Sequence, residues 1–169
     1  MNAVAGRRVT WRDLLAERLK GGRGSAIRGQ LRGRALEDFV EGVLSEVFGD
    51  GAFDARCQFV GASGVGVEKA DFAVPSKADP AVLIEVKAYG ATGSKQTDVL
   101  GDVNKIIREK RPDTAFLLVT DGITWKSRVN DLRKLVDLQN RGEITRIYTQ
   151  SMRGQLAADL MQLKSEHRL

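Results

Sequence analysis

Two charged residues stand inside a segment that otherwise has the character of a buried strand. Glu85 and Lys87 interrupt the run "AVLIEVKAYG", which is dense in aliphatic and β-branched residues and is bounded by Pro80 and Gly90. Because side chains alternate between the two faces of a strand, Glu85 and Lys87 are predicted to be neighbours on one face. A carboxylate and an ammonium group held side by side on a strand are candidate catalytic residues.

A second carboxylate is predicted to join them. Asp71 lies on the expected strand "KADFAVP", which the turn "SKADP" connects to the strand that carries Glu85 and Lys87. A hairpin that pairs symmetrically about residue 78 places Asp71 opposite Glu85, with Lys87 beside both. Two carboxylates placed side by side repel each other, and a sheet does not need them. A divalent cation removes the conflict, since Mg²⁺ favours one or two carboxylates and keeps several waters.

The chemistry that fits this set is hydrolysis of a phosphodiester. The reaction needs a nucleophilic water, neutralisation of charge on the phosphate and help for the departing oxyanion. Asp71 and Glu85 would hold the metal, while Lys87 would orient or help to deprotonate the water and stabilise charge on the phosphate. The structural alternative is that Glu85 and Lys87 form a surface ion pair on a solvated edge strand, worth about 0 to 1 kcal/mol.

A third acid, Glu37, lies on an expected helix upstream of these strands. It could complete the metal shell directly or through a water molecule. Glu41 follows one turn later on the same flank, so Glu37 could equally be an ordinary solvated acid on a helix surface.

The rarity of cysteine and histidine excludes other kinds of site. Cys57 is the only cysteine, and His167 is the only histidine, close to the C-terminus where disorder is common. A Cys/His zinc site, a disulfide framework, a Ser-His-Asp triad and a Cys-His pair all need residues that this sequence lacks. Any catalysis must therefore use carboxylates and lysine, with or without a hard metal ion.

The elements that must position these residues follow from the spacing of apolar residues. The periodicity within residues 35–51 predicts a helix that stops at Gly49, then three consecutive strands, and then alternating helices and strands. The expected strands are residues 52–61, 69–75, 81–89, 114–120 and 144–149, and the later helices are residues 95–110, 125–139 and 155–164. This order predicts an α/β fold with a central mixed β-sheet, antiparallel at the three-strand meander and parallel at the crossover, flanked by helices on both faces.

Positive charge is concentrated at the beginning of the sequence. Residues 1–34 contain nine Lys or Arg against two acidic residues, which leaves 18 basic and 20 acidic residues in the remainder. We expect a basic N-terminal arm, residues 1–33, on a nearly neutral domain, residues 34–169. Such an arm suggests a polyanion, most simply nucleic acid, although a solvated and partly disordered tail would have the same composition. The glycine-rich segment 20–34 within it is predicted to be a loop.

Composition and length complete the general description. The sequence has 169 residues, 42% apolar and 29% charged, which suits one globular domain with a real core. No apolar run approaches the ~20 residues that span a bilayer, and "MNAVAGRRVTWRDLL" lacks the apolar stretch of a signal peptide. We therefore expect no membrane association and a cytoplasmic location.

The motif and its surroundings resemble a known superfamily. "D71-x13-E85-V-K87", preceded by a helix that carries Glu37 and set in an α-β-β-β-α-β order, resembles the PD-(D/E)XK nucleases, which include many type II restriction endonucleases. The resemblance spans residues 34–149. It implies that Asp71 and Glu85 bind metal, that Lys87 is the catalytic lysine and that Glu37 is the helix acid. The segments "YGATGSKQ" and "VTDGITWKSRVNDL" are similar to the DpnII-like group of restriction enzymes.

The expected function is therefore cleavage of double-stranded DNA by a metal-dependent endonuclease of the type II restriction class, which uses Mg²⁺ with Mn²⁺ as a substitute. Two alternatives stay open, namely a recombination or repair nuclease of the same fold and a DNA-binding module without catalysis. One site per chain suggests a homodimer for cutting both strands.

Seven residues are candidates for contact with DNA. Four belong to the basic segment and three follow the expected active-site strand or the next strand; they are Arg23, Arg28, Arg32, Arg34, Lys95, Gln96 and Lys126. Lys95 and Gln96 stand where a helix is expected to begin, so ordinary capping is the alternative for them. Trp125, beside Lys126, could meet DNA or pack on the core. The "GASGVG" segment lacks the spacing of a phosphate-binding loop and is predicted to be a turn.

Overall fold

The computed structural model describes residues 10–20, 29–66, 68–89, 98–122, 125 and 128–169. Its elements follow the predicted order, with an additional short helix at the beginning. They are α1 (Trp11–Lys20), α2 (Gly29–Phe48), β1 (Asp54–Phe59), β2 (Glu68–Val74), β3 (Val82–Tyr89), α3 (Val99–Glu109), β4 (Ala115–Gly122), α4 (Val129–Asn140), β5 (Arg146–Tyr148), the 3₁₀ turn η2 (Gln150–Met152) and α5 (Arg153–His167).

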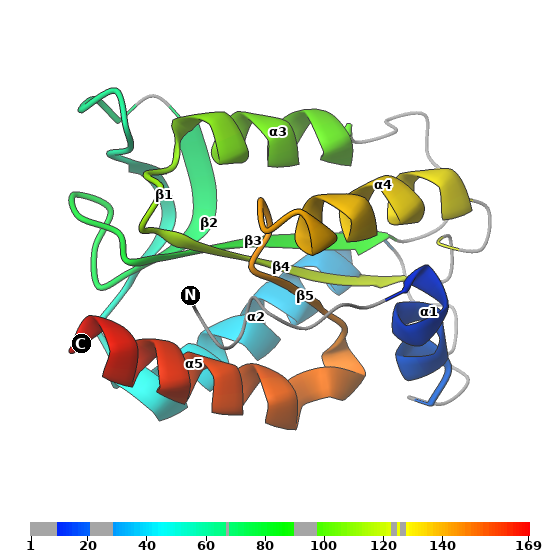
Figure 1. Cartoon of the computed structure of the whole chain (residues 1–169). Coiled ribbons are helices and arrows are strands. Elements are labelled where there is room, and N and C mark those ends of the chain that lie inside the picture. The colour runs from blue at the N-terminus through cyan, green and yellow to red at the C-terminus, as the bar shows by residue number, and fades with distance from the viewer. Residues whose placement is uncertain (1–9, 21–28, 67, 90–97, 123–124, 126–127) are drawn as a thin grey trace.

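The five strands form one mixed sheet in the order β1-β2-β3-β4-β5. β1, β2 and β3 pair antiparallel, whereas β3, β4 and β5 pair parallel. Because the two parallel connections run through α3 and α4, both of these helices cover one face of the sheet, and α2 and α5 cover the other (Figure 1). The predicted α/β architecture is confirmed.

β3 lies at the centre of the sheet and is covered on both faces. Val82, Leu83 and Ile84 are fully buried. The parallel ladder from β3 to β4 begins at the pair Val82 and Ala115 and continues through the rest of the strand. The interpretation of Glu85 and Lys87 as residues of a solvated edge strand is therefore wrong, because β2 and β4 flank the strand that carries them.

Two details of the helices differ from the sequence prediction. α1 ends at Lys20 and α2 begins at Gly29, so the loop predicted for residues 20–34 is wrong for its first residue and for its last six, 29–34. The end of α2 was predicted correctly, because Gly49 follows Phe48 with φ of +96°, a conformation that glycine adopts at little cost. His167 is the last residue of α5 rather than part of a disordered end, because the apolar face of α5 packs into the core.

The short helix α1 packs on the domain. Leu14 is buried in the main core, and the Trp11 ring lies under the guanidinium of Arg133 from α4, 5.0 Å from its centroid. Part of the basic N-terminal segment is thus fixed to the body of the molecule. No helix in the described ranges is long and apolar enough to cross a membrane.

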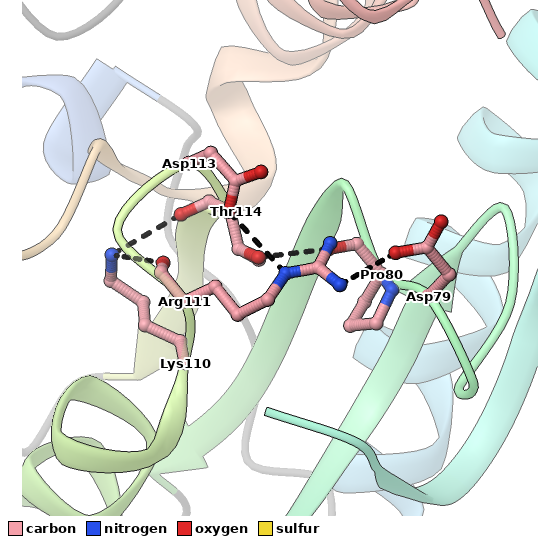
Figure 2. Close-up of polar contacts among 6 residues, drawn as sticks. All are labelled: Asp79, Pro80, Lys110, Arg111, Asp113 and Thr114. Carbon is pink, nitrogen blue, oxygen red and sulfur yellow. Dashed lines mark hydrogen bonds and ion pairs between the residues drawn. The ribbon is translucent and has the colours of Figure 1, made fainter. Parts of the chain in front are cut away.

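A polar network fixes the amino ends of β3 and β4 relative to each other (Figure 2). Arg111, in the loop before β4, contacts Asp79 Oδ1 at 2.6 Å and donates to the Pro80 carbonyl in the loop before β3. Thr114 Oγ1 donates to the same carbonyl at 2.8 Å, and Lys110 donates to the Thr114 carbonyl. These contacts lie at the start of the parallel β3–β4 ladder, which pairs Glu85 with Leu118 and Lys87 with Thr120 further along.

Candidate active site

Asp71 and Glu85 meet where the β2–β3 ladder ends. The ladder pairs Phe72 with Ile84 and Val74 with Val82, the register predicted for a hairpin centred on residue 78. The next position in that register opposes Asp71 to Glu85. There the Asp71 carboxylate replaces the ladder bond, since its Oδ2 accepts a hydrogen bond from the backbone N–H of Val86 at 2.7 Å.

Lys87 is held between two carboxylates. Its Nζ lies 2.7 Å from Glu85 Oε1 on the same strand and 3.1 Å from Asp102 Oδ2 on α3. The predicted proximity of Glu85 and Lys87 is therefore observed. Glu85 is only 6% exposed, so this ion pair lies inside the molecule and not on a screened surface.

Burial and mutual repulsion shift the titration of these groups. Burial raises the pKa of Glu85 to about 7, and the charge of Asp71 adds to the rise. Burial also raises the pKa of Asp71, against the hydrogen bond from Val86 and the charge of Lys87. Burial lowers the pKa of Lys87, but the charges and hydrogen bonds of Glu85 and Asp102 together outweigh it, and the pKa stands above its ordinary value. Two carboxylates that are costly to ionise therefore lie beside an ammonium that stays charged.

These side chains line one cavity of about 890 Å³. β1, β2 and β3, the turn before β3 and α3 contribute its walls. The charged lining residues are Asp54, Asp71, Glu85, Asp102, Arg56, Lys69, Lys77 and Lys87. The lining thus combines four acidic with four basic side chains, Asp71, Glu85 and Lys87 among them.

Glu37 reaches the same region from α2 but is paired with an arginine. Glu37 Oε2 accepts from Arg56 Nη2 at 2.9 Å and from Arg56 Nε at 3.1 Å. Its charge contributes to the raised pKa of Asp71, so it lies within electrostatic reach of the pair. Among the described residues, no group of three or more His, Cys, Asp or Glu side chains is arranged to hold a metal ion. The role of Glu37 as a metal ligand stays a prediction.

Most of the predicted DNA contacts lie beyond the part of the chain that can be described. Five fall outside the described residues, namely Arg23, Arg28, Lys95, Gln96 and Lys126. Arg32 and Arg34 belong to α2, and Arg34 is exposed. Trp125 is buried, and its indole N–H donates to Thr120 Oγ1 at 3.1 Å, which agrees with the core-packing interpretation.

Two residues of the site were not found from the sequence. Asp102 is one of many acids in helices, and only the crossover from β3 to α3 brings it onto Lys87. Nothing in the sequence singled out Arg56 among the other basic residues. The turn "GASGVG" is centred between residues 63 and 64, and a hairpin about this centre has a register that opposes Arg56 to Asp71. The ladder on either side of this position has that register.

Comparison with models of protein families gives a match. A family model described as DpnII restriction endonuclease matches residues 32–151, more than half of the chain. The matched residues contain all five strands and every residue that lines the cavity. Neither the curated proteins nor the solved structures gave a match.

Proposed function

The chain belongs to the DpnII restriction endonuclease family, which makes it a DNA endonuclease, and from that premise we propose that it cuts double-stranded DNA by metal-dependent hydrolysis. Type II restriction is the function we assign to it. The observation that carries the proposal is the buried Glu85 and the half-buried Asp71 with the Lys87 ammonium against Glu85, all within one cavity.

The residues present fit a divalent cation. Restriction endonucleases generally use divalent metals, and Asp71 and Glu85 offer the hard oxygen donors that Mg²⁺ and Mn²⁺ prefer. Their raised pKa values reflect burial first and nearby negative charge second, and a cation would offset the cost of ionising both carboxylates. We assign them as the ligands of Mg²⁺, with Mn²⁺ as a substitute and Glu37 as a third ligand directly or through water. When bound, the ion supplies polarisation of the phosphate and a more acidic water.

Lys87 supplies positive charge at the reacting phosphate. Glu85 and Asp102 hold its ammonium at the end of β3, where it can donate to a phosphate oxygen and orient the attacking water. A charge fixed before the reaction stabilises the transition state without reorganisation, which is the largest contribution in many hydrolytic sites. Asp71, anchored by the N–H of Val86, keeps its carboxylate beside Glu85.

The rest of the chain is assigned to binding DNA. We propose that residues 1–33, part of which packs on the domain through α1, are a basic segment that contacts the DNA backbone and that residues 34–169 are the nuclease domain, with Arg23, Arg28, Arg32 and Arg34 as phosphate contacts. Lys95, Gln96 and Lys126 are proposed contacts from the domain. The described part of the chain carries one candidate site, so cleavage of both strands in one encounter requires two copies, and we propose a homodimer.

Plasmid cleavage tests this proposal. Purified protein is incubated with plasmid in Mg²⁺, Mn²⁺, Ca²⁺ or excess chelator, and the ends are sequenced. We expect cutting at one short sequence in Mg²⁺ and Mn²⁺, and binding with little turnover in Ca²⁺ because its looser shell positions water poorly. Ends without a common sequence would favour a repair or recombination nuclease. Binding without cleavage in any metal would leave only a DNA-binding module.

A further inference from the structure

Arg56 occupies a strained position at the mouth of the cavity. Its backbone has φ of +48°, in the left-handed region that residues other than glycine rarely adopt. Its neighbours Ala55 and Cys57 pair with Phe72 and Ala70, while Arg56 itself leaves the ladder. Strain of this kind persists where the surroundings hold it in place, and it concentrates at functional sites.

The strained backbone and Glu37 together aim the guanidinium. Nε and Nη2 of Arg56 both donate to Glu37 Oε2, yet the Arg56 side chain is 65% exposed. This pairing uses one edge of the guanidinium and leaves three of its five N–H donors outside the pair. An arginine fixed in this way is suited to bidentate binding of a phosphate, because less conformational freedom is lost when it binds.

Further cations surround it on the rim of the same cavity. Lys69 and Lys77 are exposed and line the cavity with Arg56. The backbone of Lys77 is tied to β1 at both ends, since its N–H donates to Asp54 Oδ2 and its carbonyl accepts from the Val60 N–H, each at 2.7 Å. These three cations are exposed, whereas Glu85 is buried. A phosphate backbone that reached the carboxylates would pass these cations.

We propose that Arg56, oriented by Glu37, binds a phosphate of the DNA strand beside the phosphate that is cleaved, with Lys69 and Lys77 as flanking contacts. This rests on the proposed nuclease function. Arg56 is then a substrate-binding residue, and Glu37 acts through it as a positioning residue. The assignment competes directly with that of Glu37 as a metal ligand, and the two can be separated.

The first experiment measures binding of a fluorescent mixed-sequence duplex without metal, by anisotropy over a range of salt concentrations. Arg56→Ala should weaken binding by about tenfold and flatten the dependence of log K on log salt by about 0.9. Arg56→Lys should restore the salt slope but only part of the affinity. Lys134→Ala, on the exposed face of α4, is the control and should match the wild type. Binding by Arg56→Ala at wild-type strength would overturn the proposal.

Arg56→Gly separates binding from folding. Glycine accepts the positive φ, so this variant should melt at or above the wild-type temperature while binding DNA as weakly as Arg56→Ala. Wild-type affinity in Arg56→Gly would contradict the proposal even if Arg56→Ala failed to fold.

The second experiment asks what Glu37 acts through. Glu37→Ala, Arg56→Ala and the double variant are compared by duplex affinity and by Mn²⁺ titration. If Glu37 positions Arg56, the double variant binds DNA no more weakly than Arg56→Ala, and Mn²⁺ affinity is unchanged in all three. A loss of Mn²⁺ affinity confined to the Glu37 variants, with additive losses of DNA affinity, would contradict the positioning role. Failure of the wild type to cleave plasmid would instead count against the nuclease function, since neither experiment depends on turnover.

Discussion

Glu85 is a buried carboxylate that lies beside a second carboxylate, Asp71. Its pKa is raised to about 7, so a proton occupies the carboxylate below neutrality in the metal-free protein. A metal ion needs the deprotonated form and must displace that proton. The residue therefore couples metal binding to pH in the physiological range.

This coupling gives the first prediction. Apparent Mn²⁺ affinity should be constant above about pH 7 and should fall by up to about tenfold for each pH unit below it, as the proton competes with the metal. Calorimetric titration between about pH 5.5 and pH 8 measures this. Glu85→Gln removes the titrating group and should bind weakly without the steep dependence. An affinity that does not change over this range in the wild type would contradict the assignment of Glu85 as a ligand.

Asp102 is the second residue whose contacts predict a measurable effect. It shares the Lys87 ammonium with Glu85, so Asp102→Asn should loosen the lysine and lower kcat by about tenfold, with little change in KM. Asp50→Asn, an exposed acid outside the cavity, is the control. A change in KM alone would mean that Asp102 acts on DNA binding instead.

Helix α3 determines where Asp102 stands. Asp98 caps the helix, and its Oδ1 accepts from the Gly101 N–H at 2.9 Å. A side chain at Gly101 would meet the Asp98 carboxylate, since an added Cβ would lie 2.3 Å from Oδ2. The Asp98 cap therefore fixes the first turn of α3 at Gly101, the residue directly before Asp102.

Removal of this cap should affect both stability and activity. Asp98→Ala should cost about 1 kcal/mol of unfolding free energy, measured by urea denaturation, and should lower kcat as the first turn of α3 frays. Asp98→Asn, whose side chain can still cap, should stay close to the wild type in both. Equal losses in the two variants would show that the charge of Asp98, and not the cap, matters.

The elements and their order could be predicted because their signals are local. Apolar periodicity predicted the strands and helices from residue 35 onward, and the symmetric hairpin predicted the register that brings Asp71 to Glu85. The start of α2 was missed because glycine and arginine between residues 29 and 34 resemble a loop, although the helix continues through them. Asp102 and the pairing of Glu37 with Arg56 depend on contacts between distant elements, which no local pattern encodes.

At the scale of the whole molecule, the basic N-terminal segment carries positive charge and also contributes an apolar residue to the core. Leu14 is buried, so deletion of residues 1–30 would remove part of the core along with the charges. Substitution of charges is the cleaner experiment. It keeps the apolar contacts of α1 and changes only the electrostatic attraction to DNA.

Replacement of Arg7, Arg8, Arg23 and Arg28 by serine should weaken duplex binding by orders of magnitude at low salt. If all four engage phosphates, the slope of log K against log salt should flatten by about 3 to 4, at ~0.9 per contact. Anisotropy titrations at several salt concentrations measure this, with Lys134→Ser as the control. An unchanged slope would assign the basic residues to solubility or dimerisation.

The central claim is that Asp71, Glu85 and Lys87 form one metal-dependent catalytic centre, and single-turnover cleavage of plasmid by Lys87→Ala in Mg²⁺ tests it most directly. Lys87→Ala should cut at least ~10²-fold more slowly than the wild type while binding DNA with similar affinity, because the ammonium acts on charge that develops in the transition state. Asp71→Ala and Glu85→Ala should lose at least as much, and Lys134→Ala should lose nothing. Cleavage by Lys87→Ala at the wild-type rate, or robust cutting by the wild type in excess chelator, would contradict the account.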